Sequence, residues 1–231
     1  MYKRQTVYTV DLLGCGRSDK SSITYTNFVY VQMISDFIKK IIGQKTDVIA
    51  SGFSGSFVTM ACHNEKELFN KIMLVNPPSL TQLKQMPNRK DRLLKAALEI
   101  PIFGTLVYHM IVSRDNINNL FIEKMYYNPF HVDNQMADAY YEAAHKGGYY
   151  TRFLYSSLAA KYININICHA LKALDNSIYI VEGETEPNGK AVTDDYCASN
   201  PAIEVSVLKE TKHLPHVEAP EAFLEQVKIF F

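Results

Sequence analysis

Hydrophobic and polar positions change their period several times along the chain, and each change predicts a different element. Apolar residues recur at helical spacing over 30–41, before Gly43, and again in a segment beginning at Pro220. Short runs rich in β-branched and apolar residues predict buried parallel strands at 6–10, 47–50, 71–75, 177–181 and 203–208. The alternation of predicted strands with helical segments along the chain predicts an α/β fold, with a mostly parallel sheet and helices on both faces.

A long middle segment breaks this alternation. Residues 79–174 contain no convincing strand, show helical patterning and are rich in Tyr and Phe. A structureless loop of that length inside a compact domain is improbable. We therefore expect a helical cap, or lid, over 79–174, inserted between two parts of the sheet domain at 6–78 and 175–231.

Composition excludes several classes of protein. Lys plus Arg and Asp plus Glu number 24 each, so no net charge favours a nucleic-acid partner or an anionic membrane surface. No apolar run has the length of a membrane span. The four cysteines lack metal-site spacing, which indicates reduced thiols and a cytoplasmic protein. We expect a small-molecule substrate and neither metal nor cofactor, while the oligomeric state is left open.

The first five residues, MYKRQ, form a separate case. They match the translation of a common sequencing-adapter end, so residues 1–5 are interpreted as adapter-derived and the natural gene as interrupted before Thr6. A genuine start at Met1 is the alternative.

A small-residue turn follows the predicted strand at 47–50. Gly52-Phe53-Ser54-Gly55-Ser56 has the form of a G-x-S-x-G nucleophile elbow, with serine in place of the second glycine. Such a turn holds its serine in a strained backbone conformation, so the residues two before and two after it must be small. Centring the turn on Ser51 or Ser56 would place a bulky residue, Ile49 or Val58, in one of those positions. This favours Ser54 as a nucleophile over a serine that merely caps a helix.

Three motifs in this order give the chain a family resemblance. Residues 11–18 match a D-x-x-G-x-G-x-S loop, residues 52–56 match the elbow, and His213, Glu218 and Pro220 match a terminal H-x-x-x-x-E-x-P pattern. The chain resembles the α/β-hydrolase superfamily, in the capped branch that includes esterases, C–C bond hydrolases, epoxide hydrolases and haloalkane dehalogenases. The resemblance extends from about residue 6 to residue 231.

The resemblance implies a catalytic triad with His213 as base. His216 then falls on a variable, pocket-lining position. Glu186 occupies the place of the acid, in a G-x-x-E sequence before the last strand. Asp194 and Asp195 are the alternatives for the acid, and a solvated acidic loop remains a possible interpretation of Glu186.

The sequence accounts for only one of the two N–H donors that an oxyanion hole requires. The backbone N–H of Gly55 is predicted as one donor, worth roughly 3 kcal/mol of transition-state stabilisation. The second donor normally follows an upstream strand, and the sequence contains no such segment. We therefore predict that the chain lacks its first strands and that the 231-residue product alone is poorly stable and inactive.

The resemblance implies hydrolysis of an ester-like bond of a small, mainly apolar substrate through an acyl-enzyme on Ser54. A serine nucleophile argues against dehalogenase and epoxide hydrolase chemistry, which begins with aspartate in those relatives. The alternatives are a C–C bond hydrolase or thioesterase with the same triad, and a hydrolase-fold binding protein without catalysis.

Overall fold

The computed structural model describes residues 6–231, so the interpretation of residues 1–5 as adapter-derived lies outside the described residues. The strands are β1 (Thr46–Ser51), β2 (Phe69–Val75), β3 (Ile178–Gly183) and β4 (Glu204–Leu208). The α-helices are α1 (Asn27–Phe37), α2 (Ser54–Asn64), α3 (Leu80–Leu83), α4 (Arg89–Glu99), α5 (Pro101–Ile111), α6 (Arg114–Leu120), α7 (Asn134–His145), α8 (Arg152–Ala159), α9 (Cys168–Ala173), α10 (Gly189–Ser199), α11 (Pro215–Glu218) and α12 (Pro220–Phe230). Short π-helical turns extend α1 over Ile38–Ile42 and α6 over Phe121–Met125, and 3₁₀ turns lie at Lys66–Leu68, Pro129–His131 and Gly148–Thr151.

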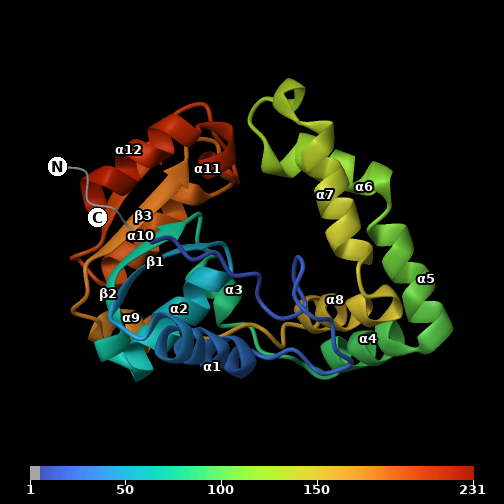
Figure 1. The fold of residues 1–231 in the computed structure, drawn as a ribbon. Helices are drawn as coiled ribbons and strands as arrows, with labels where there is room; N and C mark the ends of the chain where they lie inside the picture. Colours follow the sequence, from blue (N-terminus) through green and yellow to red (C-terminus); the bar gives the residue numbers. More distant parts are fainter. Residues whose placement is uncertain (1–5) are drawn as a thin grey trace.

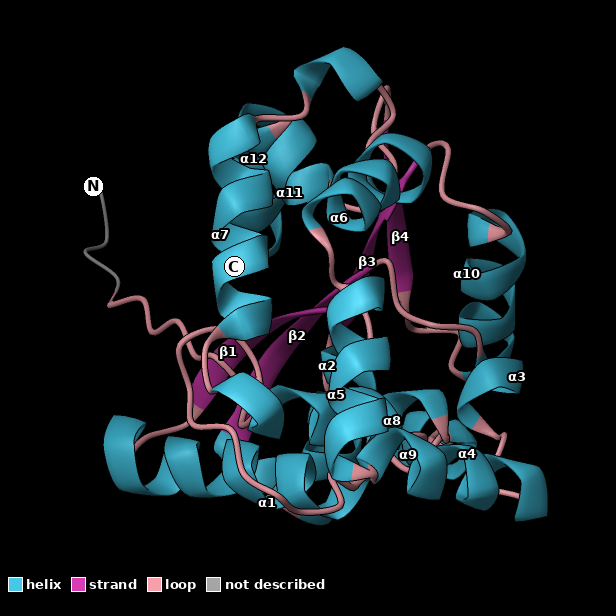
Figure 2. Ribbon diagram, turned by 90° about the vertical axis from the view of Figure 1, so that its right-hand side faces the viewer, coloured by secondary structure: helices cyan, strands magenta, loops and turns pink. Residues whose placement is uncertain are grey.

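All described strands form one parallel sheet in the order β1-β2-β3-β4. Successive side chains of a strand face opposite sides, and the two cores follow that alternation. Ile72 and Leu74 of β2 belong to the larger core with α1, α2 and α9, whereas Met73 faces the smaller core under α12. Figure 2 shows α12 on one side of the strands and α2 and α9 on the other. The predicted α/β sheet with helices on both faces is therefore confirmed.

The strand predicted at residues 6–10 is wrong. These residues belong to no strand, and Val7 is 80% exposed. β-Branched residues stabilise a strand only when a neighbouring strand receives their hydrogen bonds and side chains. No described strand lies alongside this segment, and β1 pairs only with β2 within residues 6–231.

The helices α4 to α8 form an arm that stands away from the sheet (Figure 1). Between β2 and β3 the described chain forms helices and loops but no strand, as the sequence predicts. A hydrophobic cluster containing Ile117, Phe121 and Tyr126 joins the arm to Leu214, beside the catalytic histidine predicted from the sequence. Among residues 6–231 no single helix is long and apolar enough to span a membrane; α4 and α5 reach that length only together, across a 97° bend.

Candidate active site

The turn between β1 and α2 places its left-handed residue at Gly52. Gly52 has φ +58°. Its N–H donates to the carbonyl oxygen of Val75 at 2.9 Å, so the hydrogen bonding between β1 and β2 extends as far as Gly52. Phe53 already has helical dihedral angles, and α2 begins at Ser54. The prediction that this turn holds Ser54 in a strained conformation is therefore wrong. The chain reverses direction two residues earlier, at a glycine that accepts a positive φ without steric cost.

Ser54 makes a local hydrogen bond. Its hydroxyl donates to the carbonyl oxygen of Ser51 at 2.8 Å. No hydrogen bond joins it to His213 in the part of the chain that the structure describes. The structure thus places Ser54 at the start of α2, and its role as nucleophile stays a prediction.

His213 and Glu186 are brought together from the loops that follow the neighbouring parallel strands β4 and β3. Nδ1 of His213 lies 3.0 Å from Oε1 of Glu186. Both side chains are partly buried, with 34% and 19% of their area exposed. A carboxylate at Nδ1 holds the imidazole in one orientation and leaves Nε2 to exchange protons. Of the alternative acids, Asp194 instead pairs with Lys190 on the surface of α10, at 3.2 Å.

Asn76 fixes the loop that carries His213. Its side-chain amide donates to the carbonyl oxygens of Lys212, at 2.8 Å, and His213, at 3.0 Å. Its side-chain oxygen accepts from the N–H of Gly183 at 3.0 Å. Asn76 is 5% exposed and has φ +42°, a conformation that asparagine tolerates better than most residues. This side chain therefore links the end of β2 to the end of β3 and to the histidine loop.

Glu218 holds the same loop from its other end. Its carboxylate accepts from the backbone N–H of Lys212 at 2.8 Å and from that of Tyr127 at 2.6 Å. The N–H of His213 in turn donates to the carbonyl oxygen of Met125 at 3.1 Å. The spacing of His213 and Glu218 in the terminal motif thus has a physical basis, because the carboxylate binds the backbone next to the base.

A cavity of about 380 Å³ opens beside the His213–Glu186 pair. Gly52 and Phe53 form part of its wall, whereas Ser54 is not among the described residues that line it. Glu182 also faces this cavity; it is 6% exposed, and its Oε2 has no hydrogen-bond partner within residues 6–231. Burial raises the pKa of the Glu182 carboxyl, and the nearby charge of Glu186 adds to that rise.

His216 lies outside this cavity. Its ring packs against the ring of Phe223, with centroids 5.8 Å apart. Burial, and then the neighbouring His213, lower the pKa of His216. A neutral, packed imidazole of this kind suits a structural role. The geometry therefore favours His213 as the base.

The N–H groups of the turn differ from the predicted oxyanion hole. The N–H of Gly55 donates to the carbonyl oxygen of Gly52 at 3.1 Å, so it is engaged in this conformation. The N–H of Phe53 has no hydrogen-bond acceptor among residues 6–231. Phe53 lines the same cavity as His213, so its N–H is better placed as a donor than the engaged N–H of Gly55.

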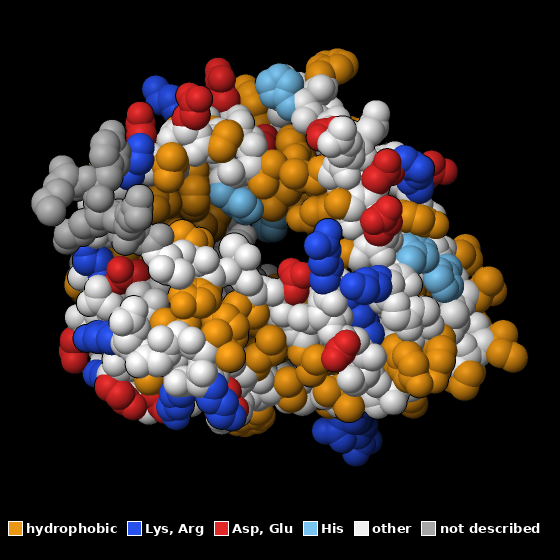
Figure 3. Space-filling model, viewed as in Figure 1, with side chains coloured by type: hydrophobic (Ala, Val, Ile, Leu, Met, Phe, Trp, Pro, Cys, Tyr) orange, Lys and Arg blue, Asp and Glu red, His pale blue; other side chains and the backbone are white. Residues whose placement is uncertain are grey.

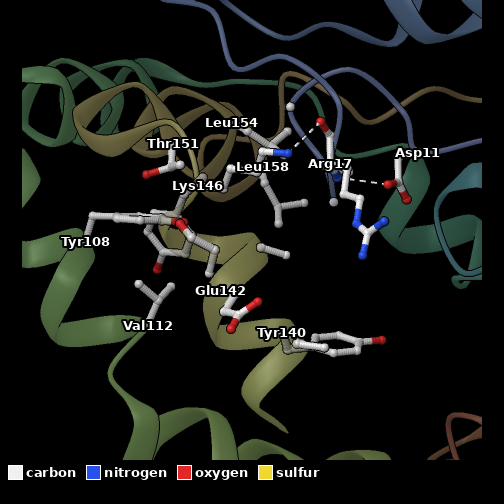
Figure 4. A pocket seen from close by; sticks show the side chains of 17 residues that line it. Asp11, Arg17, Tyr108, Val112, Tyr140, Glu142, Lys146, Thr151, Leu154 and Leu158 are labelled. Carbon is white, nitrogen blue, oxygen red and sulfur yellow. Dashed lines mark hydrogen bonds between the residues drawn. The ribbon is translucent and has the colours of Figure 1, made fainter. Parts of the chain in front are cut away.

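A larger cavity of about 870 Å³ lies between the loop at residues 11–19 and the helical arm. Asp11 shapes this loop, because its carboxylate accepts from the N–H of Arg17 at 2.8 Å. Tyr108, Tyr140 and the aliphatic part of α8 line the cavity from the arm, with Glu142 and Lys146 nearby (Figure 4). Figure 3 shows the face of the molecule hollowed at its centre, with hydrophobic and histidine side chains on one rim and Lys and Arg on the other.

The structure offers no evident metal site, since no three His, Cys, Asp or Glu side chains in residues 6–231 are grouped to hold an ion.

The sequence profile described as "Alpha/beta hydrolase family" matches residues 2–226. The chain belongs to the alpha/beta hydrolase family. A comparison with curated proteins finds no match.

Solved structures of other alpha/beta hydrolases share the fold at low sequence identity. A carboxylesterase of the thaumarchaeon Nitrososphaera gargenis is 16% identical, with a TM-score of 0.68 over 95% of this chain and 77% of its own. The 2-hydroxy-6-oxo-6-phenylhexa-2,4-dienoate hydrolase of Rhodococcus sp. strain RHA1 is also 16% identical, with a TM-score of 0.72 over 96% and 78%. The epoxide hydrolase CorEH is 13% identical, with a TM-score of 0.74 over 96% and 80%. At such identities the likeness shows the fold, and these relatives perform different reactions.

Sequence reasoning missed two residues of this site. Gly52 was overlooked because only serines were tested as the centre of the turn, although Ala50 and Ser54 satisfy the same small-residue rule around it. Asn76 was not among the predicted site residues, because its three hydrogen bonds to distant backbone groups depend on the tertiary fold.

Proposed function

We propose that this alpha/beta hydrolase cleaves an ester-like bond of a small, mainly apolar substrate, with His213 as general base and Glu186 orienting it. The observation that carries the proposal is the 3.0 Å contact between Nδ1 of His213 and Glu186 at the wall of a cavity. An imidazole held in this way can accept a proton at Nε2 and return it to a leaving group. Such proton transfer contributes about 10²–10⁴-fold to a rate.

The larger cavity supports the proposed substrate class. Its walls combine Tyr108, Tyr155, Leu154 and Leu158, which favour an apolar group, with a few charged side chains that could orient a polar end. The helical arm that supplies most of this wall is proposed to act as the cap over the substrate.

The sequence predicts an acyl-enzyme on Ser54. That route requires the Ser54 hydroxyl to leave the carbonyl oxygen of Ser51 and to reach His213. Turnover of the 231-residue chain alone is expected to be slow, because a single oxyanion donor stabilises the transition state less than a pair of donors does.

The decisive experiment compares His213→Ala with His216→Ala on panels of p-nitrophenyl esters, acyl thioesters and vinylogous diketones. We expect one class to be hydrolysed, with a loss of about 10²–10⁴-fold in His213→Ala and a much smaller loss in His216→Ala. The preferred panel separates an esterase from a thioesterase or a C–C bond hydrolase. A substrate that His213→Ala and the unmodified chain hydrolyse at the same measurable rate would refute the proposal.

A binding protein with a hydrolase fold is the second candidate. It is favoured by one observation, the engagement of the Ser54 hydroxyl with Ser51 rather than with His213. A ligand from these panels that raises the melting temperature of a folded chain but is never turned over would support this candidate.

A further inference from the structure

In the turn after β1, Gly52 has the surroundings that the sequence predicts for Ser54: small residues two positions before and two positions after the apex. Gly52 is the residue with positive φ between the strand and the helix. The residues two before and two after it, Ala50 and Ser54, are both small. Gly52 also lines the cavity that contains His213. The apex of the elbow, where a nucleophile would point toward the base, is thus a glycine.

There is room for a side chain at this apex. Apart from its two chain neighbours, a Cβ atom built on Gly52 has no atom of residues 6–231 within 4 Å. By contrast, Ser54 is the first residue of an 11-residue helix, and its hydroxyl bonds back to residue 51. Donation to the carbonyl three residues earlier is one of the local side-chain-to-backbone hydrogen bonds that serine commonly makes.

The other hydroxyl groups of the cavity wall make local hydrogen bonds, Ser79 at the start of α3 and Thr193 within α10. The Ser79 hydroxyl oxygen accepts from the N–H of Gln82, and the Thr193 hydroxyl donates to the carbonyl oxygen of Lys190. Neither bonds to His213 among the described residues. Within the described cavity wall, no serine or threonine is therefore hydrogen-bonded to the base.

We infer that His213 takes its proton from a water molecule in the cavity beside Gly52, and that hydrolysis proceeds without an acyl-enzyme. This inference rests on the proposed function and changes its nucleophile. Nε2 of His213 accepts a proton from water, the hydroxide oxygen bonds to the substrate carbonyl carbon, and a tetrahedral oxyanion forms. Cleavage of the bond to the leaving group follows, and the proton passes from His213 to the departing oxygen. The products are one acid and one alcohol, and the enzyme is unchanged.

The N–H of Phe53 completes this arrangement. It directly follows the apex, lies in the cavity wall and has no acceptor within the described chain. A backbone donor immediately after the apex is the position from which the nucleophile elbow supplies its first oxyanion contact. The donor is thus placed by Gly52 rather than by Ser54.

A matched pair of thiol variants tests which position faces His213. Gly52→Cys and Ser54→Cys each introduce one thiol, and peptide mass spectrometry follows its alkylation by iodoacetamide from pH 5 to 9. A thiol beside an imidazolium titrates at about 3.5–7.5, against about 8.5 for an ordinary thiol. We expect the thiol at position 52 to react with a midpoint below pH 7.5, and this shift to vanish when His213→Ala is added. The thiol at position 54 should react with an ordinary midpoint.

The thiol experiment can refute the inference directly. A lowered midpoint at position 54, or equal midpoints at both positions, overturns the inference. A side chain at φ +58° costs about 1–2 kcal/mol, so cooperative melting of both variants is verified first. Gly52→Ser provides a second variant: it should gain labelling by a fluorophosphonate that the unmodified chain lacks. Labelling of the unmodified chain at Ser54 also overturns the inference.

Turnover separates this inference from the proposed function. If both hold, His213→Ala loses activity about 10²–10⁴-fold, while Ser54→Ala changes it less than about tenfold. Equal, severe losses in both variants retain the proposed function and refute the direct attack by water. No effect of His213→Ala refutes the proposed function itself.

Discussion

Replacing Asn76 by aspartate changes one amide to a carboxylate where three segments of the chain meet. The amide of Asn76 donates to the carbonyl oxygens of Lys212 and His213, and its side-chain oxygen accepts from Gly183. Asn76→Asp keeps the size of the side chain and its acceptor. It removes both donated hydrogen bonds and places a negative oxygen against two carbonyl oxygens.

The expected loss can be worked from these contacts. Each buried carbonyl left without a donor costs about 1–3 kcal/mol, so two of them lower the free energy of unfolding by about 2–6 kcal/mol at pH 8. This is a large part of the roughly 5–15 kcal/mol available to a domain. Burial and the facing carbonyl oxygens should raise the pKa of the new carboxyl above about 3.9. Because the protonated form can donate one hydrogen bond, the loss should shrink as the pH falls toward 5.

Urea denaturation at pH 8 and pH 5 measures this effect. Asn119→Asp, an identical change at an exposed position of α6, is the matched control and should shift stability by less than about 0.5 kcal/mol. If Asn76→Asp is as stable as the unmodified chain at pH 8, the amide does not hold the histidine loop. A loss that grows on acidification would contradict the pH argument.

Two further predictions concern the end of β3. Gly183→Ala should lower stability by about 3 kcal/mol or more in urea denaturation, because its Cβ would overlap the backbone carbonyl oxygen of Lys212. In Gly43→Ala the Cβ would meet no atom of residues 6–231 beyond its chain neighbours, so only the strain of a positive φ, about 1–2 kcal/mol, is expected, and a loss there equal to that of Gly183→Ala would refute the steric argument. The raised pKa of Glu182 means that the folded state holds this proton more tightly than the unfolded state, so its stabilising contribution is present below about pH 4.3 and is lost as the pH rises through the raised value. Glu182→Gln should therefore melt at a higher temperature at pH 8 and lose that advantage by pH 4, and a lower melting temperature at pH 8 would contradict the assignment.

Much of the fold could be predicted from local patterns. Four of the five predicted strands and the terminal helix at Pro220 are present, because their apolar runs and helical spacing are properties of neighbouring residues. The strand at residues 6–10 failed for the opposite reason. Its β-branched residues specify a preference, whereas a strand also requires a partner.

In the candidate site, too, some features could be predicted from the sequence and others depended on the tertiary structure. The motifs of the sequence, through the family resemblance they carry, implied His213 as base and Glu186 as acid with Asp194 and Asp195 as alternatives, and the structure brings Nδ1 of His213 within 3.0 Å of Glu186. The sequence could not determine the apex of the elbow, since both Gly52 and Ser54 have small residues two positions before and two positions after them. Only the tertiary structure decided that point: hydrogen bonding to β2 carries the chain as far as Gly52, and α2 then begins at Ser54, so the reversal falls on the glycine. Side-chain spacing is local, but the place where a strand ends depends on its neighbour in the sheet.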